Sequence, residues 1–226
     1  LSSHCGSNDG RVVVWFDQCS GGYNLRQTNT AEQPYIFSAG NTITLGSNNK
    51  PSILFSGSNV PQNNLNLEAS SNFGPIPDQY SYHMVQDRPV SGVVGYTLLN
   101  IYYTYAGYGA FWNDDNYIYM FAGFRDNSDP LTSESFGFNG SSGIKTILAA
   151  RDSDTSAHSW INASLVGTMD PIENPVWFED PAILNAGTVI NGQIHRLPEV
   201  ITFEQTLDSS DATSIHSNCS DYWGYI

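Results

Sequence analysis

A run of aromatic and small residues that ends in amides and carboxylates is the part of the sequence best suited to bind a ligand. The run extends from Tyr102 to Tyr117, and its candidate carbohydrate contacts are Tyr108, Trp112, Asn113, Asp114, Asp115, Asn116 and Tyr117. Sugar rings stack on aromatic faces, and their hydroxyls form hydrogen bonds with Asp and Asn side chains. The run therefore predicts a carbohydrate site, although core packing of alternate tyrosines or a subunit interface would explain the same residues.

Two short acidic segments offer the hard oxygen ligands that Ca²⁺ prefers. Asp114 and Asp115 lie in the first segment, and Asp126 and Asp129 lie in the second. Neither contains a complete calcium-loop motif, and ordinary Asx turns explain both. A zinc site is not expected, because the sequence has no Cys-x-x-Cys or His-Glu-x-x-His pair. We expect that no cofactor is required, and calcium is the ion for which ligands are present.

Short segments rich in β-branched and aromatic residues recur along the chain and predict strands. They are Val12–Phe16, Ser52–Phe55, Tyr96–Tyr105, Tyr117–Phe124, Ile144–Ala150, Val176–Phe178 and Val200–Phe203. Turns rich in Gly, Asn, Asp and Pro separate them, and Asn191-Gly192 predicts a tight hairpin. Only Asp208–Tyr222 has helical spacing, with Asp208 or Ser209 as the N-cap. The pattern predicts one all-β domain over residues 1–226, an antiparallel sandwich with a short C-terminal helix.

Composition excludes some partners. The formal net charge is -14 at pH 7, and the 8 Lys and Arg residues form no cluster, so the chain cannot neutralise a nucleic-acid backbone. The longest apolar stretches fall short of the roughly 20 residues that span a bilayer, so no membrane insertion is expected. Leu1–Cys5 lacks the basic start and apolar core of an export signal, and we expect that any such signal has been removed.

Acceptor triplets and cysteines indicate an extracellular or cell-surface protein. Asn139, Asn162 and Asn218 each begin an Asn-x-Ser triplet and are predicted to carry glycans. Cys5 and Cys19 bracket a predicted strand, and a disulfide between them would close a loop of about 15 residues and stabilise the fold by about 3 kcal/mol. Cys219 would then remain as a buried thiol or form a bond to another chain.

The segment Asp9–Gly22, which contains Trp15-Phe16-Asp17-Gln18, resembles the WYDQSG strand-and-turn motif of a concanavalin A-like (laminin G-like) family. This family includes bacterial and phage surface proteins and the catalytic domain of arabinofuranosidase B. Further matching segments follow in the family's order: Gln27, Gln33–Ile36, Lys50–Gly57, Asn191–Gln193, Glu199–Phe203, Leu207, Ile215 and Tyr222–Gly224. The resemblance implies a jelly-roll sandwich, and residues 65–188 match it only as a strand pattern.

Domains of this family usually have a further strand before the Trp-Phe-Asp-Gln element. The chain begins too close to Trp15 to supply it. The strand was removed, or the sheet pairs differently, or another chain donates a strand to the open edge.

Because this family includes glycosidases, which act through a pair of carboxylates, we searched the sequence for such a pair. Concanavalin A-like glucanases place them as Glu-x-Asp-x-x-Glu, and Glu134, Glu173, Glu179, Glu199 and Glu204 all lack a companion at that spacing. There is also no Gly-x-Ser-x-Gly elbow, and no cysteine has a plausible histidine partner in sequence. We therefore carry over no catalytic residue and expect a non-catalytic protein.

Two functions without catalysis remain. The first is a structural or adhesive subunit of a cell-surface or filamentous assembly, which would contact other copies of itself or another extracellular chain. The alternative is a lectin-like module that binds a polysaccharide or another glycan through the residues around Trp112. A glycoside hydrolase is the third and least favoured function.

Overall fold

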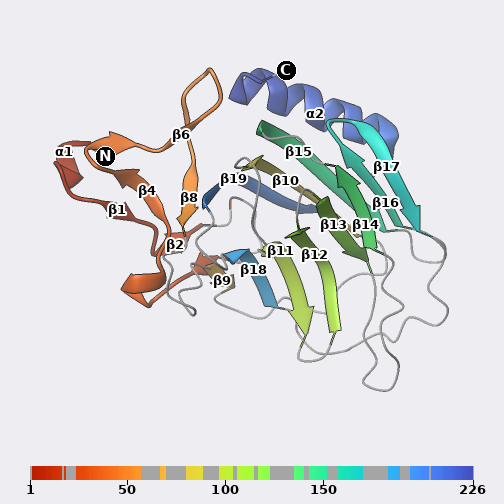
Figure 1. The fold of residues 1–226 in the computed structure, drawn as a ribbon, viewed down its shortest axis with the longest axis horizontal. Helices are drawn as coiled ribbons and strands as arrows, with labels where there is room; N and C mark the ends of the chain where they lie inside the picture. The colour runs from red at the N-terminus through yellow and green to blue at the C-terminus, as the bar shows by residue number, and fades with distance from the viewer. Residues whose placement is uncertain are drawn as a thin grey trace.

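The chain folds into two large antiparallel sheets and a C-terminal helix in the computed structural model (Figure 1). The structure describes residues 2–16, 18, 24–56, 67–69, 80–88, 97–103, 106–114, 117–122, 135–139, 143–151, 157–169, 183–188, 194–203 and 205–225. Every strand pair within these ranges is antiparallel. The predicted all-β class with a short C-terminal helix is confirmed.

The larger sheet, sheet A, carries the C-terminal helix. Its spatial order is β1 (Gly10–Arg11), β4 (Tyr35–Ser38), β8 (Ile53–Ser56), β19 (Ile194–Phe203), β10 (Tyr80–Arg88), β15 (Gly143–Arg151), β16 (Ala157–Ile161) and β17 (Ser164–Met169), with β5 (Asn41–Thr42) paired to β4. The helix is α2 (Ser209–Trp223). A short helix α1 (Ser2–Cys5) and a 3₁₀ turn η1 (Thr30–Glu32) lie near the N-terminus.

The second sheet, sheet B, contains the aromatic run. Its order is β14 (Ser135–Asn139), β13 (Tyr117–Ala122), β12 (Ala106–Asp114), β11 (Thr97–Tyr103), β18 (Ile183–Thr188), β9 (Leu67–Ala69), β3 (Leu25–Arg26) and β2 (Val14–Trp15). Two further short strands, β6 (Thr44–Leu45) and β7 (Lys50–Pro51), pair with each other.

Strand β10 is covered on both faces. Residues 81–86 are all buried, although three of them, Ser81, His83 and Gln86, are polar. Alternate residues point to opposite sides of the sheet. Val85 packs with Cys219 and Trp223 of α2, so Ser81 and His83 also face the helix. The neighbours Tyr82 and Met84 are buried on the other face of the sheet.

Helix α2 begins and ends where the sequence indicates. The Asp208 side chain accepts from the N–H groups of Ser210 and Asp211, and the Asp211 side chain accepts from the Asp208 N–H, which makes a capping box. Gly224 ends the helix in the left-handed conformation, with φ of 69°. The buried face of α2 rests on sheet A through Ala212 and Cys219. The predicted helix over Asp208–Tyr222 is confirmed to within one residue at each end.

The turn between β6 and β7 holds the C-terminal end of α2, as Figure 1 shows at the upper left of the helix. Ser47 Oγ donates to the Gly224 carbonyl at 2.7 Å, and Asn48 Nδ2 donates to the Asp221 carbonyl at 2.9 Å. Gly46 has φ of 70°, and a Cβ there would lie 1.6 Å from the Trp223 carbonyl oxygen. Glycine is therefore required at position 46 for the close approach of the two backbones.

Two local predictions are wrong. The strands that flank Asn191-Gly192 do not form a hairpin, because β18 pairs with β11 and β9 in sheet B whereas β19 pairs with β8 and β10 in sheet A. Asn191 and Gly192 themselves lie outside the described residues. The predicted Cys5–Cys19 disulfide is also not formed, because Cys5 is a free, partly buried thiol whose sulfur packs against Gly10. Cys19 and the predicted strand Val176–Phe178 lie outside the described residues.

Candidate functional site

The predicted carbohydrate residues fall on one hairpin of sheet B. Strand β12 ends at Asp114 and β13 begins at Tyr117, and these two residues are paired across the hairpin. Asn113 pairs with Ile118 and Trp112 pairs with Tyr119. The backbone therefore brings Trp112, Asn113, Asp114 and Tyr117 to one end of the hairpin. Asp115 and Asn116, which join the two strands, lie outside the described residues.

Tyr108 lies at a distance from this group. It pairs with Ala122, near the opposite end of the β12–β13 ladder, and the register shifts between Tyr108 and Phe111. The four residues 112–114 and 117 thus form a compact set, and Tyr108 is not part of it.

The predicted calcium ligands are not brought together by the described part of the chain. Asp114 is the last residue of β12, whereas Asp115, Asp126 and Asp129 lie outside the described residues. Calcium binding at these aspartates stays a prediction.

The three predicted glycosylation sites have different surroundings. Asn162 and Ala163 form the two-residue turn between β16 and β17, with φ of 47° and 64°. The Asn162 Oδ1 accepts from the Thr146 N–H at 3.0 Å, so this side chain also has a structural role. Asn218 is exposed on α2, and Asn139 is the last residue of β14. Attachment of a glycan at each of the three stays a prediction.

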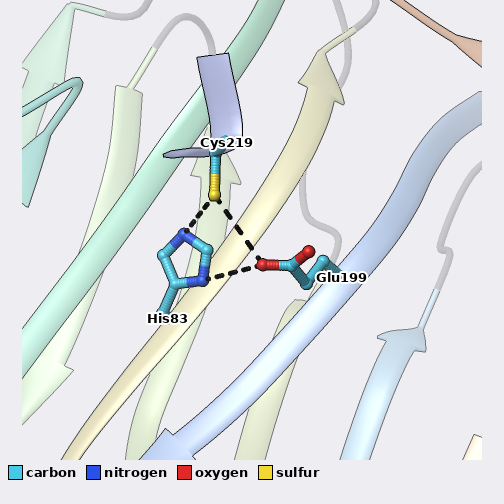
Figure 2. A group of neighbouring side chains, drawn as sticks. All are labelled: His83, Glu199 and Cys219. Atoms are coloured by element: carbon cyan, nitrogen blue, oxygen red, sulfur yellow. Dashed lines mark hydrogen bonds and ion pairs between the residues drawn. The ribbon is translucent and has the colours of Figure 1, made fainter. Parts of the chain in front are cut away.

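A second group of chemically reactive side chains lies between sheet A and α2 (Figure 2). His83 comes from β10, Glu199 from β19 and Cys219 from α2. Cys219 Sγ lies 3.7 Å from His83 Nε2 and 3.7 Å from Glu199 Oε1, and His83 Nδ1 lies 3.5 Å from the same carboxylate oxygen. We call these three residues the His–Glu–Cys cluster.

Burial controls the ionisation of this cluster. It lowers the pKa of His83 to about 4, so the imidazole is neutral at pH 7. It also raises the pKa of Cys219 to about 12, and the nearby Glu199 carboxylate acts in the same direction. The pKa of Glu199 is raised by burial, and contacts with Cys219 and Trp223 partly offset the rise.

The order Cys–His–Glu is that of a nucleophilic triad, but the cluster is unsuited to that chemistry. A nucleophilic cysteine needs a lowered pKa and access to substrate. Cys219 is buried and its thiol keeps its proton at neutral pH. The arrangement instead offers three different donor atoms to a cation.

Sequence patterns did not reveal the His–Glu–Cys cluster. More than 100 residues separate His83 from Glu199 in the sequence. Zinc motifs, in contrast, are recognised by ligands that are close in sequence. Cys219 is buried with a free thiol within this chain, and the alternative of a bond to another chain stays a prediction. Its partners depend on β10 and β19 being neighbours, which the pattern of the sequence does not specify.

No protein-family model matches the sequence, and no curated protein matches it. Several solved structures have a similar fold. The binding domain of Paraclostridial Mosquitocidal Protein 1 is 12% identical with a TM-score of 0.67, over 93% of this chain and 52% of that chain. The botulinum neurotoxin serotype G binding domain is 14% identical with a TM-score of 0.63, and the match covers 96% of this chain and 54% of that chain. The botulinum neurotoxin serotype D ligand-binding domain was solved in complex with N-acetylneuraminic acid. It is 11% identical with a TM-score of 0.64, and the match covers 95% of this chain and 54% of that chain.

These similarities concern the fold. The chain spans about half the length of the solved chains that it matches, and the identities are too low to carry over any residue. They show that this all-β fold also occurs in the binding domains of these toxins. No helix in the part of the chain that the structure describes is long and apolar enough to cross a membrane.

Proposed function

We propose that the chain is a non-catalytic carbohydrate-binding module whose sugar site lies at the end of the β12–β13 hairpin. The observation that supports this proposal is the register that pairs Asp114 with Tyr117 and Trp112 with Tyr119. The backbone therefore places a tryptophan, an asparagine, an aspartate and a tyrosine at the same end of one hairpin. These residue types are the ones that bind sugar rings and their hydroxyls.

The similar binding domains add support at the level of the fold. One was solved with N-acetylneuraminic acid, and another concerns botulinum neurotoxin type C, whose interaction is with two ganglioside molecules. One fold supports many functions, so the main weight lies on the hairpin residues. The concanavalin A-like (laminin G-like) jelly-roll arrangement and the extracellular location are part of the same proposal.

Charge favours a neutral sugar over a sialylated one. The chain has a net charge of -14, and Asp114, at the end of β12, is followed directly in the sequence by Asp115. Carboxylates accept hydrogen bonds from neutral hydroxyls, but they repel the carboxylate of a sialic acid. We therefore infer that the ligand is a neutral glycan, unlike the acidic sugar bound by the serotype D domain.

Replacement of Trp112 by alanine should reduce retention on an immobilised neutral polysaccharide by about tenfold or more, which corresponds to a loss of about 1.4 kcal/mol of binding free energy. Affinity electrophoresis of the purified variant measures this change. Asp114→Asn should weaken binding as well, because the amide replaces a carboxylate acceptor and keeps its shape. Far-ultraviolet circular dichroism confirms that each variant is folded.

The matched control is Tyr222→Ala, which removes an exposed aromatic ring on α2, an element outside sheet B. This variant should be retained like the unmodified chain. Unchanged retention of both Trp112→Ala and Asp114→Asn would exclude the hairpin as the sugar site.

Self-assembly is a second candidate function, supported by an apolar surface at an open sheet edge. Strand β2 is the last strand of sheet B among those that the structure describes, and edge strands offer unpaired backbone groups to another chain. The flanking side chains Val13 and Phe16 are 48% and 64% exposed. Apolar side chains beside such an edge favour association.

Light scattering over a concentration series tests this second function. The native mass should rise above the 24.8 kDa of one chain as concentration increases. The double substitution Val13→Ser and Phe16→Ser should keep the chain monomeric, because it removes the apolar surface beside β2. A constant monomer mass for the unmodified chain would exclude self-assembly at this edge.

A further inference from the structure

We propose that the His–Glu–Cys cluster binds a divalent transition-metal ion, with Zn²⁺ as the best match. An imidazole nitrogen, a carboxylate oxygen and a thiol sulfur meet where α2 packs on β10 and β19 (Figure 2). These are the three donor types that proteins use for zinc, whereas Ca²⁺ and Mg²⁺ take oxygen ligands. The donor set therefore indicates a softer ion than the calcium expected at the acidic segments.

The distances between the donor atoms are close to those of a tetrahedral zinc site. With Zn–S near 2.3 Å and Zn–N or Zn–O near 2.0 to 2.1 Å, tetrahedral angles place the sulfur about 3.6 Å from the other donors and those two about 3.4 Å apart. Cys219 Sγ lies 3.7 Å from His83 Nε2 and from Glu199 Oε1. His83 Nδ1 lies 3.5 Å from the same oxygen.

Little movement would complete the site. One donor atom from each residue lies within 4.8 Å of the donor atoms of the other two. Whichever ring nitrogen serves as the ligand, two edges of the donor triangle already have the required length. A rotation of the imidazole or of the Glu199 side chain closes the third edge.

A buried polar atom without a partner is the second observation that indicates a ligand. The side chain of His83 is 0% exposed, and its Nδ1 makes no hydrogen bond with the described residues, although the Glu199 carboxylate oxygen lies 3.5 Å away. An unpaired polar atom in the interior is unfavourable. A bound ion would supply this ring with a strong partner.

Glu199 provides the route by which an ion reaches the cluster. Its side chain is 30% exposed, whereas His83 and Cys219 are buried. Three protein ligands would leave the fourth tetrahedral position for a water molecule. The thiolate is the form of cysteine that binds metal, so binding transfers the Cys219 proton to solvent.

The bound ion would connect α2 to sheet A. Its ligands come from β10, β19 and the penultimate turn of α2, so coordination adds a direct link between the helix and two strands. Because an ion that binds the folded state stabilises it, the melting temperature should rise by about 5–10 °C when free zinc exceeds the dissociation constant by about a hundredfold.

Titration of the chelator-treated full chain with Co²⁺, followed by displacement with Zn²⁺, tests the proposal. We expect one ion per chain, a thiolate-to-cobalt charge-transfer band and the visible bands of tetrahedral Co²⁺, all of which disappear when zinc is added. Thermal unfolding with and without zinc provides the second readout.

Three variants separate this cluster from other ligands. Cys219→Ser should remove the charge-transfer band, and both Cys219→Ser and Glu199→Gln should weaken binding by more than about tenfold, the least that loss of an outer-shell partner costs. Cys5→Ser removes the other free thiol of the described residues, and it should change neither the charge-transfer band nor the affinity for the metal ion. If Cys219→Ser does not fold, the affinity of Glu199→Gln for cobalt tests the proposal, because Glu199 is partly exposed and its substitution should leave the chain folded. Absence of cobalt binding, or binding that Glu199→Gln and Cys219→Ser leave unchanged, would overturn the proposal.

Discussion

Trp160→Ala should lower the free energy of unfolding by about 3–5 kcal/mol, the usual cost of truncating a buried tryptophan. Trp160 of β16 is buried against α2, where it packs with Leu148, Leu207 and Ala212. Its indole N–H also donates to Ser209 Oγ, at 3.2 Å, in the first turn of α2. Removal of the ring leaves a cavity under the helix, and urea denaturation measures the change.

Two control variants show how much of this effect comes from packing. Trp160→Phe keeps most of the ring but loses the hydrogen bond to Ser209, so it should cost only about 1–2 kcal/mol. Leu165→Ala on β17, at an exposed position, should change stability by less than about 0.5 kcal/mol. A loss below about 1 kcal/mol for Trp160→Ala would mean that α2 does not pack on sheet A at this residue.

Gly46→Ala should destabilise the fold by about 3 kcal/mol or more, through two effects. The residue has φ of 70°, and this left-handed conformation costs an alanine about 1–2 kcal/mol. In addition, the new Cβ would lie 1.6 Å from the Trp223 carbonyl oxygen, so the β6–β7 turn and the end of α2 would have to separate. Thermal or urea unfolding measures the sum of both effects.

Gly40→Ala is the matched control for this substitution. Gly40 has a similar φ of 83°, but a Cβ there would meet nothing within 4 Å. Gly40→Ala should therefore show the conformational cost alone, and the difference between the two variants isolates the contact with α2. Equal losses for both variants would contradict the close approach of the turn to the helix.

Local patterns were sufficient to predict much of the fold. Ile53–Phe55, Ile144–Ala150 and Val200–Phe203 lie in strands, as expected from segments rich in β-branched, aromatic and other apolar residues. The helix followed from its own capping residue, because the Asp208 carboxylate satisfies the first N–H groups of α2 whatever surrounds it.

Elements that depend on long-range packing could not be predicted. Strand β10 was not recognised, because the face that meets α2 carries Ser81 and His83 rather than an apolar series. Ser81 donates to the Gln205 carbonyl and accepts from the Leu207 N–H, just before α2, and His83 contacts Cys219 of α2, so partners distant in sequence accommodate both polar groups. The hairpin predicted at Asn191-Gly192 was wrong because turn residues favour tight turns but do not determine which sheet receives the next strand.

The two candidate sites differ in how far their residues could be predicted from the sequence. The set at the end of the β12–β13 hairpin was predictable, because its residues are contiguous in sequence and antiparallel pairing keeps them together. The His–Glu–Cys cluster was not, because it requires β10 and β19 to be neighbours and α2 to cross them.

Screening the purified, chelator-treated chain against neutral and sialylated oligosaccharides on one array tests the central proposal most directly. We predict saturable binding to a group of neutral glycans and weaker binding to their sialylated counterparts, because the carboxylates of the site repel sialic acid. Absence of binding to every neutral glycan, by a chain that remains folded, would contradict the assignment of a carbohydrate-binding function.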